Sequence, residues 1–229
     1  MHCRVVLKLL FVGLALCIST LAMGHDLSSQ NAQFVQGLSG ANPGPFLYLG
    51  AKHMFTGYDH LLFILGVIFF LYRPRDIILF VTLFTLGHST TLMLGVFFDW
   101  QVSAYLVDAI IGLSVAYKAF ENMKGFDLVL PWHLDTRVAV FAFGLCHGLG
   151  LATKLQDYVD REDGLLSNLV SFNIGVELGQ ICALAAILLV LTGWRRLPVF
   201  NTQAFAVNVV LMCAGFVLFG YQLAGYFLV

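Results

Sequence analysis

An aspartate and a histidine stand side by side where the chain begins a long apolar stretch. Asp59 and His60, in GYDHLLF, precede a run that has no charged residue before Arg73. Neutral imidazole and carboxylate together suit Ni²⁺, Zn²⁺, Co²⁺ and Fe²⁺, and the acid can also orient the ring beside it as a ligand. These residue types predict a metal site. Further ionisable or amide side chains lie in later apolar segments: His88, Asp108, His147, Asn173, Glu177 and Gln180.

His53 and His60 are seven residues apart in KHMFTGYDH. On a continuous helix they would share one face but stand about 10.5 Å apart along it, too far to bind one ion together. Gly57 could break the helix between them. Without a break, His53 is an interfacial histidine with no ligand role, and both readings stay open.

Three ionisable residues follow in later segments. His88 has a threonine at i−3 and at i+3 on its own face, so either the hydroxyls satisfy it or it has a functional role. His147 lies beside Gly144 and Gly148, a GxxxG pair that permits close helix approach, so it could point into a helix junction. Asp108 is near the outer end of its segment, where a site residue and a solvated or paired carboxylate are both open.

NIGVELGQ repeats the combination of small and polar residues. Gly175 and Gly179 form a second small pair, and Asn173, Glu177 and Gln180 form a polar stripe at i, i+4 and i+7. A self-satisfied hydrogen-bond ladder would explain the two amides. It explains an ionisable Glu177 poorly, so we expect Glu177 to be a metal ligand with Asn173, Gln180 and Asp108 in support.

The composition is that of a polytopic, all-α membrane protein. The chain has 229 residues, of which 59% are hydrophobic and 11% charged, against about 25% charged in soluble domains. The net charge is −1 without a basic tract, so nothing indicates nucleic acid. The five cysteines form no CxxC pair, and the six methionines are scattered, which disfavours a disulfide framework and Cu(I).

Residues 1–24 resemble a secretory signal peptide, with Arg4 and Lys8 before an apolar core and Ala22 and Gly24 at a cleavage site. An uncleaved first helix is the alternative. Cleavage would leave His25 at the N-terminus of a short outer segment, residues 25–45. A free amine beside an imidazole can chelate a metal, but some residue must follow any cleavage site, so a ligand role for His25 stays open.

Residues 46–229 predict a six-helix transmembrane domain, because apolar stretches near the roughly 20 residues that cross a bilayer recur along it. Lys and Arg accumulate in alternate connections, which the positive-inside rule places in the cytoplasm, so both termini are expected on the outer side. The ionisable residues would then fall in the outer half or middle of the membrane, like a funnel that opens outward. The expected spans are 54–72, 76–98, 103–120, 137–153, 165–191 and 203–227.

Four motifs resemble those of the HupE/UreJ family of bacterial membrane proteins, over about residues 46–190: H-x5-D-H from His53 to His60, LGHSTTL, GLCHGLGLA and FNIGVELGQ. That family is associated with nickel supply to hydrogenase and urease, as nickel or cobalt permeases or accessory proteins. The resemblance implies that His53, Asp59 and His60 belong to a metal motif, with His147 and Glu177 in later motifs. Better-studied nickel-linked members carry HG-x-x-HG-x-E, where GLCHGLGLATK has one histidine and no glutamate. This departure suggests the second, HupE/UreJ-like branch.

The residues and the resemblance together favour a divalent-metal permease of the bacterial inner membrane, with Ni²⁺ first and Co²⁺ or Zn²⁺ next. We expect no permanently bound cofactor and no catalytic residue, and hydrogenase or urease maturation proteins are implied as partners. Three alternatives stay open: an intramembrane zinc hydrolase, a haem protein with two histidine ligands, and a scaffold for metalloenzyme maturation. The hydrolase would use His60, His88 and His147 as ligands, with Glu177 or Asp59 as base. The sequence leaves open the ion, the driving force and the oligomeric state.

Overall fold

The computed structural model describes residues 40–131, 134–156 and 164–228. The predicted signal peptide, and the outer segment up to residue 39, lie outside the described residues. Within the described ranges the regular secondary structure is helical, which confirms the all-α fold class. The helices are α3 Pro43–Thr56, α4 Tyr58–Ile68, α5 Pro74–Phe97, α6 Ala104–Asn122, α7 Phe126–Val129, α8 Thr136–Gln156, α9 Leu165–Arg195 and α10 Phe200–Leu228.

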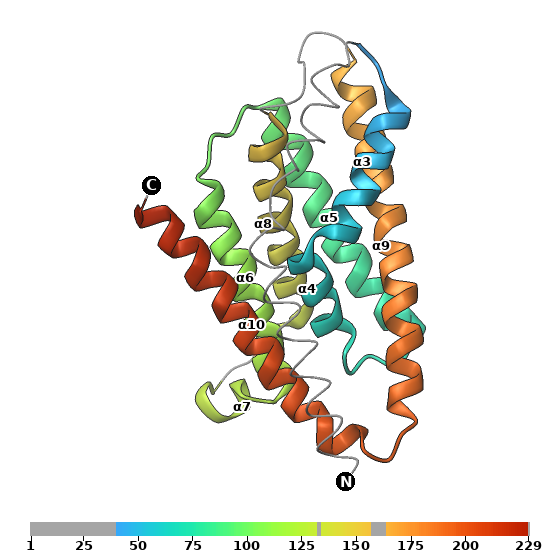
Figure 1. The fold of residues 1–229 in the computed structure, drawn as a ribbon, viewed down its shortest axis with the longest axis vertical. Coiled ribbons are helices and arrows are strands. Elements are labelled where there is room, and N and C mark those ends of the chain that lie inside the picture. The colour runs from blue at the N-terminus through green and yellow to red at the C-terminus, as the bar shows by residue number, and fades with distance from the viewer. Residues whose placement is uncertain (1–39, 132–133, 157–163, 229) are drawn as a thin grey trace.

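The long helices run up and down in one bundle (Figure 1). The α4–α5, α6–α8 and α9–α10 connections lie toward the lower end of Figure 1, and the α5–α6 connection lies at the upper end. Four helices are long and apolar enough to cross a membrane, which indicates a membrane protein. They cover four of the expected spans and are α5, α8, α9 and α10.

The other two expected spans differ from simple apolar helices. The expected span 103–120 corresponds to α6, which has 19 residues but carries three charged side chains, those of Asp108, Lys118 and Glu121. The expected span 54–72 is divided between α3 and α4, and the apolar part, α4, has only 11 residues. α3 begins at Pro43 instead, well before residue 54, because proline is favoured in the first turn of a helix.

The interruption between α3 and α4 is one residue long. Gly57 has φ −73° and ψ 98°, an extended conformation that ends one helix and begins the next. A Cβ atom at this position would lie 3.0 Å from the His53 carbonyl oxygen and 3.0 Å from His60 Nδ1. Glycine is therefore suited to this position by the close approach of its neighbours. The helix break at Gly57, which the sequence left open, is present.

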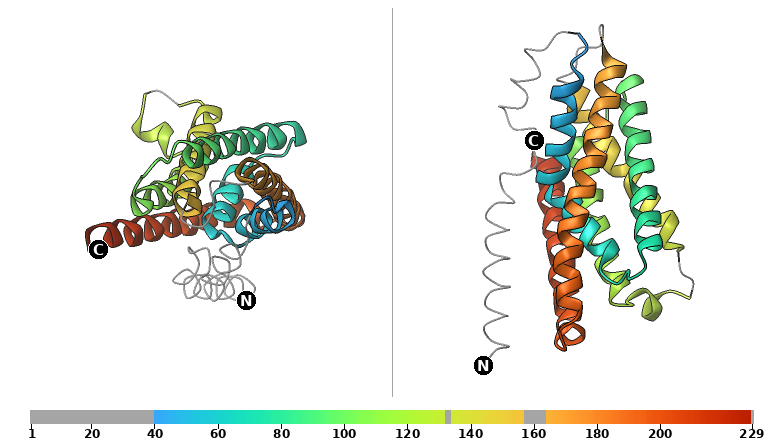
Figure 2. Two further views of the ribbon diagram at one scale, coloured as in Figure 1. Left: turned by 90° about the horizontal axis from the view of Figure 1, so that it is seen from above. Right: turned by 90° about the vertical axis from the view of Figure 1, so that its right-hand side faces the viewer.

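Glycines allow the helices to approach closely in pairs. A Cβ atom on Gly144 would lie 2.4 Å from the Phe84 carbonyl oxygen, and one on Gly148 would lie 2.0 Å from the His88 carbonyl oxygen, so α8 packs directly on the α5 backbone. Gly175 and Gly179 of α9 meet the backbone of α3 in the same way, and Figure 2 shows α3 running beside α9. Both small pairs in the sequence therefore lie at helix contacts, as predicted.

The end of α9 fixes the end of α4. The Arg195 guanidinium donates to the carbonyl oxygens of Ile68, Phe69 (2.7 Å) and Leu71 (2.9 Å). The last carbonyls of a helix have no partner within it and carry partial negative charge, so a cation is favourable there. Arg195 also lies over the Tyr72 ring, with its Cζ 4.5 Å from the ring centroid. The short α4 is thereby held at its lower end, with Gly57 at its upper end.

The contact between Gly148 and His88 leads to a stability prediction. We expect Gly148→Ala to lower the free energy of unfolding by about 1–3 kcal/mol, because the added methyl group overpacks the α5–α8 contact. The measurement is thermal unfolding of the purified protein in detergent. Gly220→Ala on α10 is the matched control, since a Cβ atom there meets nothing within 4 Å. Equal unfolding temperatures for wild type and Gly148→Ala would contradict the packing described above.

Candidate metal centre

Four histidine rings lie together, one each from α3, α4, α5 and α8, and His60 on α4 is at their centre. The centroid of the His60 ring lies 5.0 Å from that of His53, 5.7 Å from that of His88 and 4.7 Å from that of His147. The break at Gly57 brings His53 next to His60, and the close α5–α8 contact brings His88 and His147 to the same place. We call these four histidines, together with Asp59, the imidazole cluster.

The ligand atoms of the imidazole cluster form two overlapping groups. One group is His53, His60 and His88, and the other is Asp59, His60 and His147; within each, one potential ligand atom per residue lies within 4.8 Å of the others. Metal–nitrogen bonds of about 2.0–2.1 Å join donors somewhat closer than this, so an ion would draw the side chains inward. His60 belongs to both groups and is the centre of the arrangement.

Hydrogen bonds orient the ring of His60. Its Nδ1 lies 3.0 Å from Asp59 Oδ1, so a neutral ring donates from Nδ1 to the carboxylate and carries its lone pair on Nε2. Nε2 of His60 is buried with no hydrogen-bond partner among the described residues, and the same holds for both ring nitrogens of His88. Buried polar atoms without partners are costly, and a bound ion would satisfy them.

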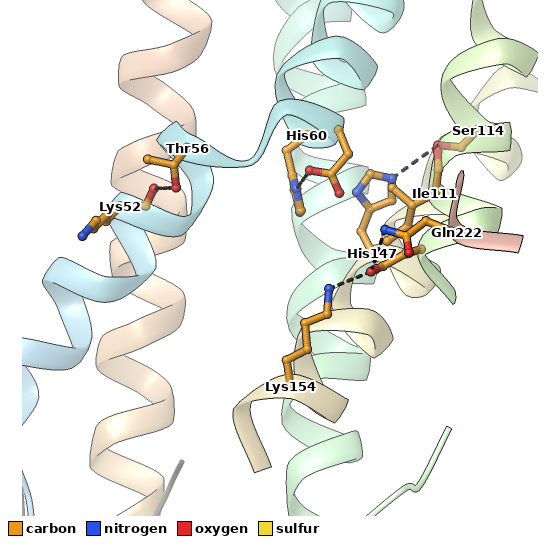
Figure 3. Close-up of polar contacts among 10 residues, drawn as sticks. Lys52, Thr56, His60, Ile111, Ser114, His147, Lys154 and Gln222 are labelled. Carbon is orange, nitrogen blue, oxygen red and sulfur yellow. Dashed lines mark hydrogen bonds and ion pairs between the residues drawn. The ribbon is translucent and has the colours of Figure 1, made fainter. Parts of the chain in front are cut away.

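Ser114 on α6 orients the ring of His147 in a similar way (Figure 3). The Ser114 hydroxyl donates its one proton to the Ile111 carbonyl oxygen at 2.6 Å. Toward His147 Nε2, at 3.3 Å, the hydroxyl therefore acts as acceptor, and a neutral ring donates from Nε2. The lone pair of His147 is then on Nδ1, and Ser114 has the role of a second-sphere partner that selects the metal-binding tautomer.

The imidazole cluster is buried except for His53, which is partly exposed. His60 is 2% exposed, His88 0% and His147 1%, and Asp59 is buried with them. Phe63 and Phe84 pack against it, with the Phe84 ring 5.0 Å and the Phe63 ring 5.3 Å from that of His147. Few water molecules can reach such a site, so electrostatic interactions within it are stronger than at the surface. One carboxylate and several neutral imidazoles suit a divalent cation there.

Other residues expected near the site have different surroundings. Asp108 forms an ion pair with Lys154 at 2.7 Å and accepts from Gln222 at 3.4 Å (Figure 3), so the reading as a paired carboxylate describes it. Asn173 donates to the Leu169 carbonyl oxygen at 2.9 Å. These side chains lie in neither ligand group. The hydrogen bond of Asn173 agrees with the alternative that the amides of the polar stripe on α9 form a hydrogen-bond ladder.

Glu177 is not brought to the imidazole cluster. It is exposed on α9 and lines a groove between α5 and α9, together with Thr82, Thr85 and Gln180. Asn173 and Gln180 lie on the side of α9 that is buried in the bundle. Glu177 belongs to the same polar stripe but lies on its exposed side. A charged group facing the bilayer centre costs about 2.5–3.5 kcal/mol on insertion scales, so this position requires a separate explanation.

Sequence reasoning missed Ser114, Phe63 and Phe84. A serine in an apolar helix commonly bonds to the carbonyl three or four residues earlier, as Ser114 does with Ile111, so its sequence context gives no signal. The two phenylalanines are indistinguishable by type from the chain's other 19, since the chain has 21. Only the packing of α4, α5 and α8 shows which of them contact the histidines.

A family model described as HupE / UreJ protein matches residues 29–229. No curated protein and no solved structure matches the chain. The match covers nearly the whole chain, including every residue of the imidazole cluster, and agrees with the resemblance of the sequence motifs. The chain therefore belongs to the HupE/UreJ family, which is associated with nickel and cobalt supply for metalloenzymes.

Proposed function

We propose that this protein is a permease that carries a divalent transition metal ion, Ni²⁺ in the first place and Co²⁺ or Zn²⁺ next, inward across the bacterial inner membrane. The observation that carries the proposal is the imidazole cluster, a set of nitrogen and oxygen ligands contributed by four helices of a membrane bundle and buried except for His53, which is partly exposed. Membership of a family linked to nickel and cobalt supply supports the choice of ions. The ion is the cargo and not a resident cofactor.

The proposed permease crosses the membrane six times, with both termini on the outer side. α3 and α4 together form one crossing that is broken at Gly57, and α6 forms another. Broken membrane helices commonly carry the ion site of a transporter. The alternation of the helices in Figure 1 supports this topology, because most of the arginines and lysines in the described ranges lie in or next to the connections at the lower end. They include Arg73, Arg75, Lys124 and Arg196.

The donor set supports a borderline metal ion. Imidazole nitrogen suits Ni²⁺, Co²⁺ and Zn²⁺, whereas Cu(I) prefers thiolate and thioether sulfur. Among the described residues, neither ligand group includes a cysteine. A transported ion must also leave its site, and a mixed set of imidazoles with one carboxylate binds less firmly than a closed cage of four ligands.

Sharing of His60 limits the cluster to one ion at a time. Because Nδ1 of His60 donates to Asp59, only Nε2 offers a lone pair, and two ions cannot use it together. The groups His53–His60–His88 and Asp59–His60–His147 are then alternative positions of a single ion. Such overlap lets an ion pass from one group to the other without leaving His60.

Nickel uptake by cells tests the permease function. Cells without their own nickel importers, carrying the wild-type protein, should show saturable uptake of radiolabelled Ni²⁺, with Co²⁺ and Zn²⁺ as competitors. His60→Ala and Asp59→Ala should abolish it, because each removes a group from the centre of the cluster. Asp127→Ala, an exposed carboxylate on α7, is the control at matched membrane levels. Unaltered uptake in both cluster variants would defeat the assignment.

Binding of Ni²⁺ to the purified protein, measured by equilibrium dialysis, tests the shared role of His60. We expect one ion per chain in the wild type, and still one in His88→Ala and in His147→Ala at lower affinity, because the other group survives. Asp59→Asn should weaken binding by about 10–100-fold, as loss of an outer-sphere partner does. Two ions per chain would contradict the shared role of His60. Zinc that survives washing with a chelator would favour the hydrolase alternative.

A further inference from the structure

The α5/α9 groove, lined by Thr82, Thr85, Glu177 and Gln180 among apolar side chains, is a second polar site in the membrane bundle. Glu177 has no hydrogen-bond or ion-pair partner within the described part of the chain. None of the residues that line the groove is a lysine, arginine or histidine. The negative charge of Glu177 must therefore be neutralised by something that enters the groove, or be removed by protonation.

The donor atoms of the groove differ from those of the imidazole cluster. The groove offers carboxylate, amide and hydroxyl oxygens from Glu177, Gln180, Thr82 and Thr85, and the cluster offers mainly imidazole nitrogen. Oxygen ligands suit protons and hard cations, whereas imidazole suits borderline transition metals. The two sites are thus expected to take different cations.

Gln180 connects the groove with the interior of the bundle. It is 1% exposed, and Thr85 donates to its Oε1 at 2.8 Å. Its side chain also lines a small inner cavity together with Phe63 and Phe84, the two rings that pack against the imidazole cluster. In addition, α5 carries both Thr85 and His88, three residues apart on one face. A change in the groove can therefore be transmitted to His88 by movement of α5 against α9.

We propose that the α5/α9 groove is a second cation site in which Glu177 binds a small hard cation, a proton or Na⁺, that is coupled to metal movement through the imidazole cluster. The coupling rests on the permease function proposed above, whereas binding in the groove does not. Loss of the cation leaves Glu177 charged in apolar surroundings. Release of the cation therefore requires water to reach the groove.

The titratable groups around Glu177 lie outside the groove. On α5, His88 lies three residues after Thr85 and belongs to the imidazole cluster, as do Asp59 and His60 on α4. α3, which packs on another face of α9, carries His53 of the cluster and Lys52, whose ammonium lies 5.9 Å from the Tyr48 ring centroid. Glu177 is therefore the one ionisable side chain among the described residues that line the groove.

Infrared difference spectroscopy of the full chain in lipid nanodiscs tests binding directly. The carboxylic-acid carbonyl band of Glu177 should be present in the wild type and absent in Glu177→Gln, with Asp127→Asn as a control that retains it. Loss of the band on raising the pH identifies a proton site. Loss on replacing choline chloride by sodium chloride at constant pH identifies a sodium site. Wild-type and Glu177→Gln spectra that respond identically to both changes would overturn the proposal.

Liposomes with imposed gradients test the coupling. Nickel uptake by the wild type should rise several-fold when a gradient of the identified cation is applied, and uptake by Glu177→Gln should not respond, although that variant binds Ni²⁺ with unchanged affinity. Wild-type uptake that ignores both gradients would overturn the coupling and leave the permease intact. Absence of uptake in every variant would instead defeat the permease, and the infrared result would still decide the groove.

Light scattering tests whether a second copy of the chain, and not a cation, occupies the α5/α9 groove. The mass of the particles in detergent should be the same for wild type and Glu177→Gln. A smaller particle for Glu177→Gln would show that the groove is covered by a partner chain, which would overturn the assignment as a cation site.

Discussion

The interruption of the first predicted span at Gly57 is the constraint on which the candidate site depends. In an unbroken helix His53 and His60 would lie about 10.5 Å apart along the axis, whereas their ring centroids are 5.0 Å apart. The break also directs Asp59 and His60 into the bundle, where both are 2% exposed. Arg195 holds the other end of α4 by donating to the carbonyl of its last residue, Ile68, and to those of Phe69 and Leu71 just beyond it, so the short helix has a fixed position at both ends.

Close contacts between α5 and α8 bring the remaining two histidines to the candidate site. His88 and His147 reach His60 because Gly144 and Gly148 let α8 rest on the backbone of α5. The same arrangement buries several ionisable rings next to Phe63 and Phe84, which an apolar interior tolerates only when the polar atoms find partners. Asp59 supplies such a partner to Nδ1 of His60, and Ser114 supplies one to Nε2 of His147. The lone pairs on His60 Nε2 and His147 Nδ1 can then bind a metal ion, which is the basis of the proposed transport.

Much of this architecture could be predicted from the sequence, because the signals were local. Composition indicated the all-α membrane class, the small pairs at Gly144 and Gly175 indicated helix contacts, and the spacing of His53 and His60 around Gly57 left a break open as one of two readings. The rest depends on orientation across helices. Glu177 shares a stripe with Gln180, yet α9 is rotated so that Gln180 is buried and Glu177 faces the groove. Likewise, the pairing of Asp108 with Lys154 joins α6 to α8, and no pattern within either segment specifies it.

X-ray absorption at the nickel edge, on Ni²⁺-loaded protein in lipid nanodiscs, tests the central claim most directly, because it reports the ligands and not the transport. The account predicts at least two histidine rings on the nickel, recognisable by the scattering of their outer carbon and nitrogen atoms, and loss of that signal in His60→Ala. A spectrum of oxygen ligands alone, or a histidine signal unchanged in His60→Ala, would contradict the assignment of the imidazole cluster as the metal site.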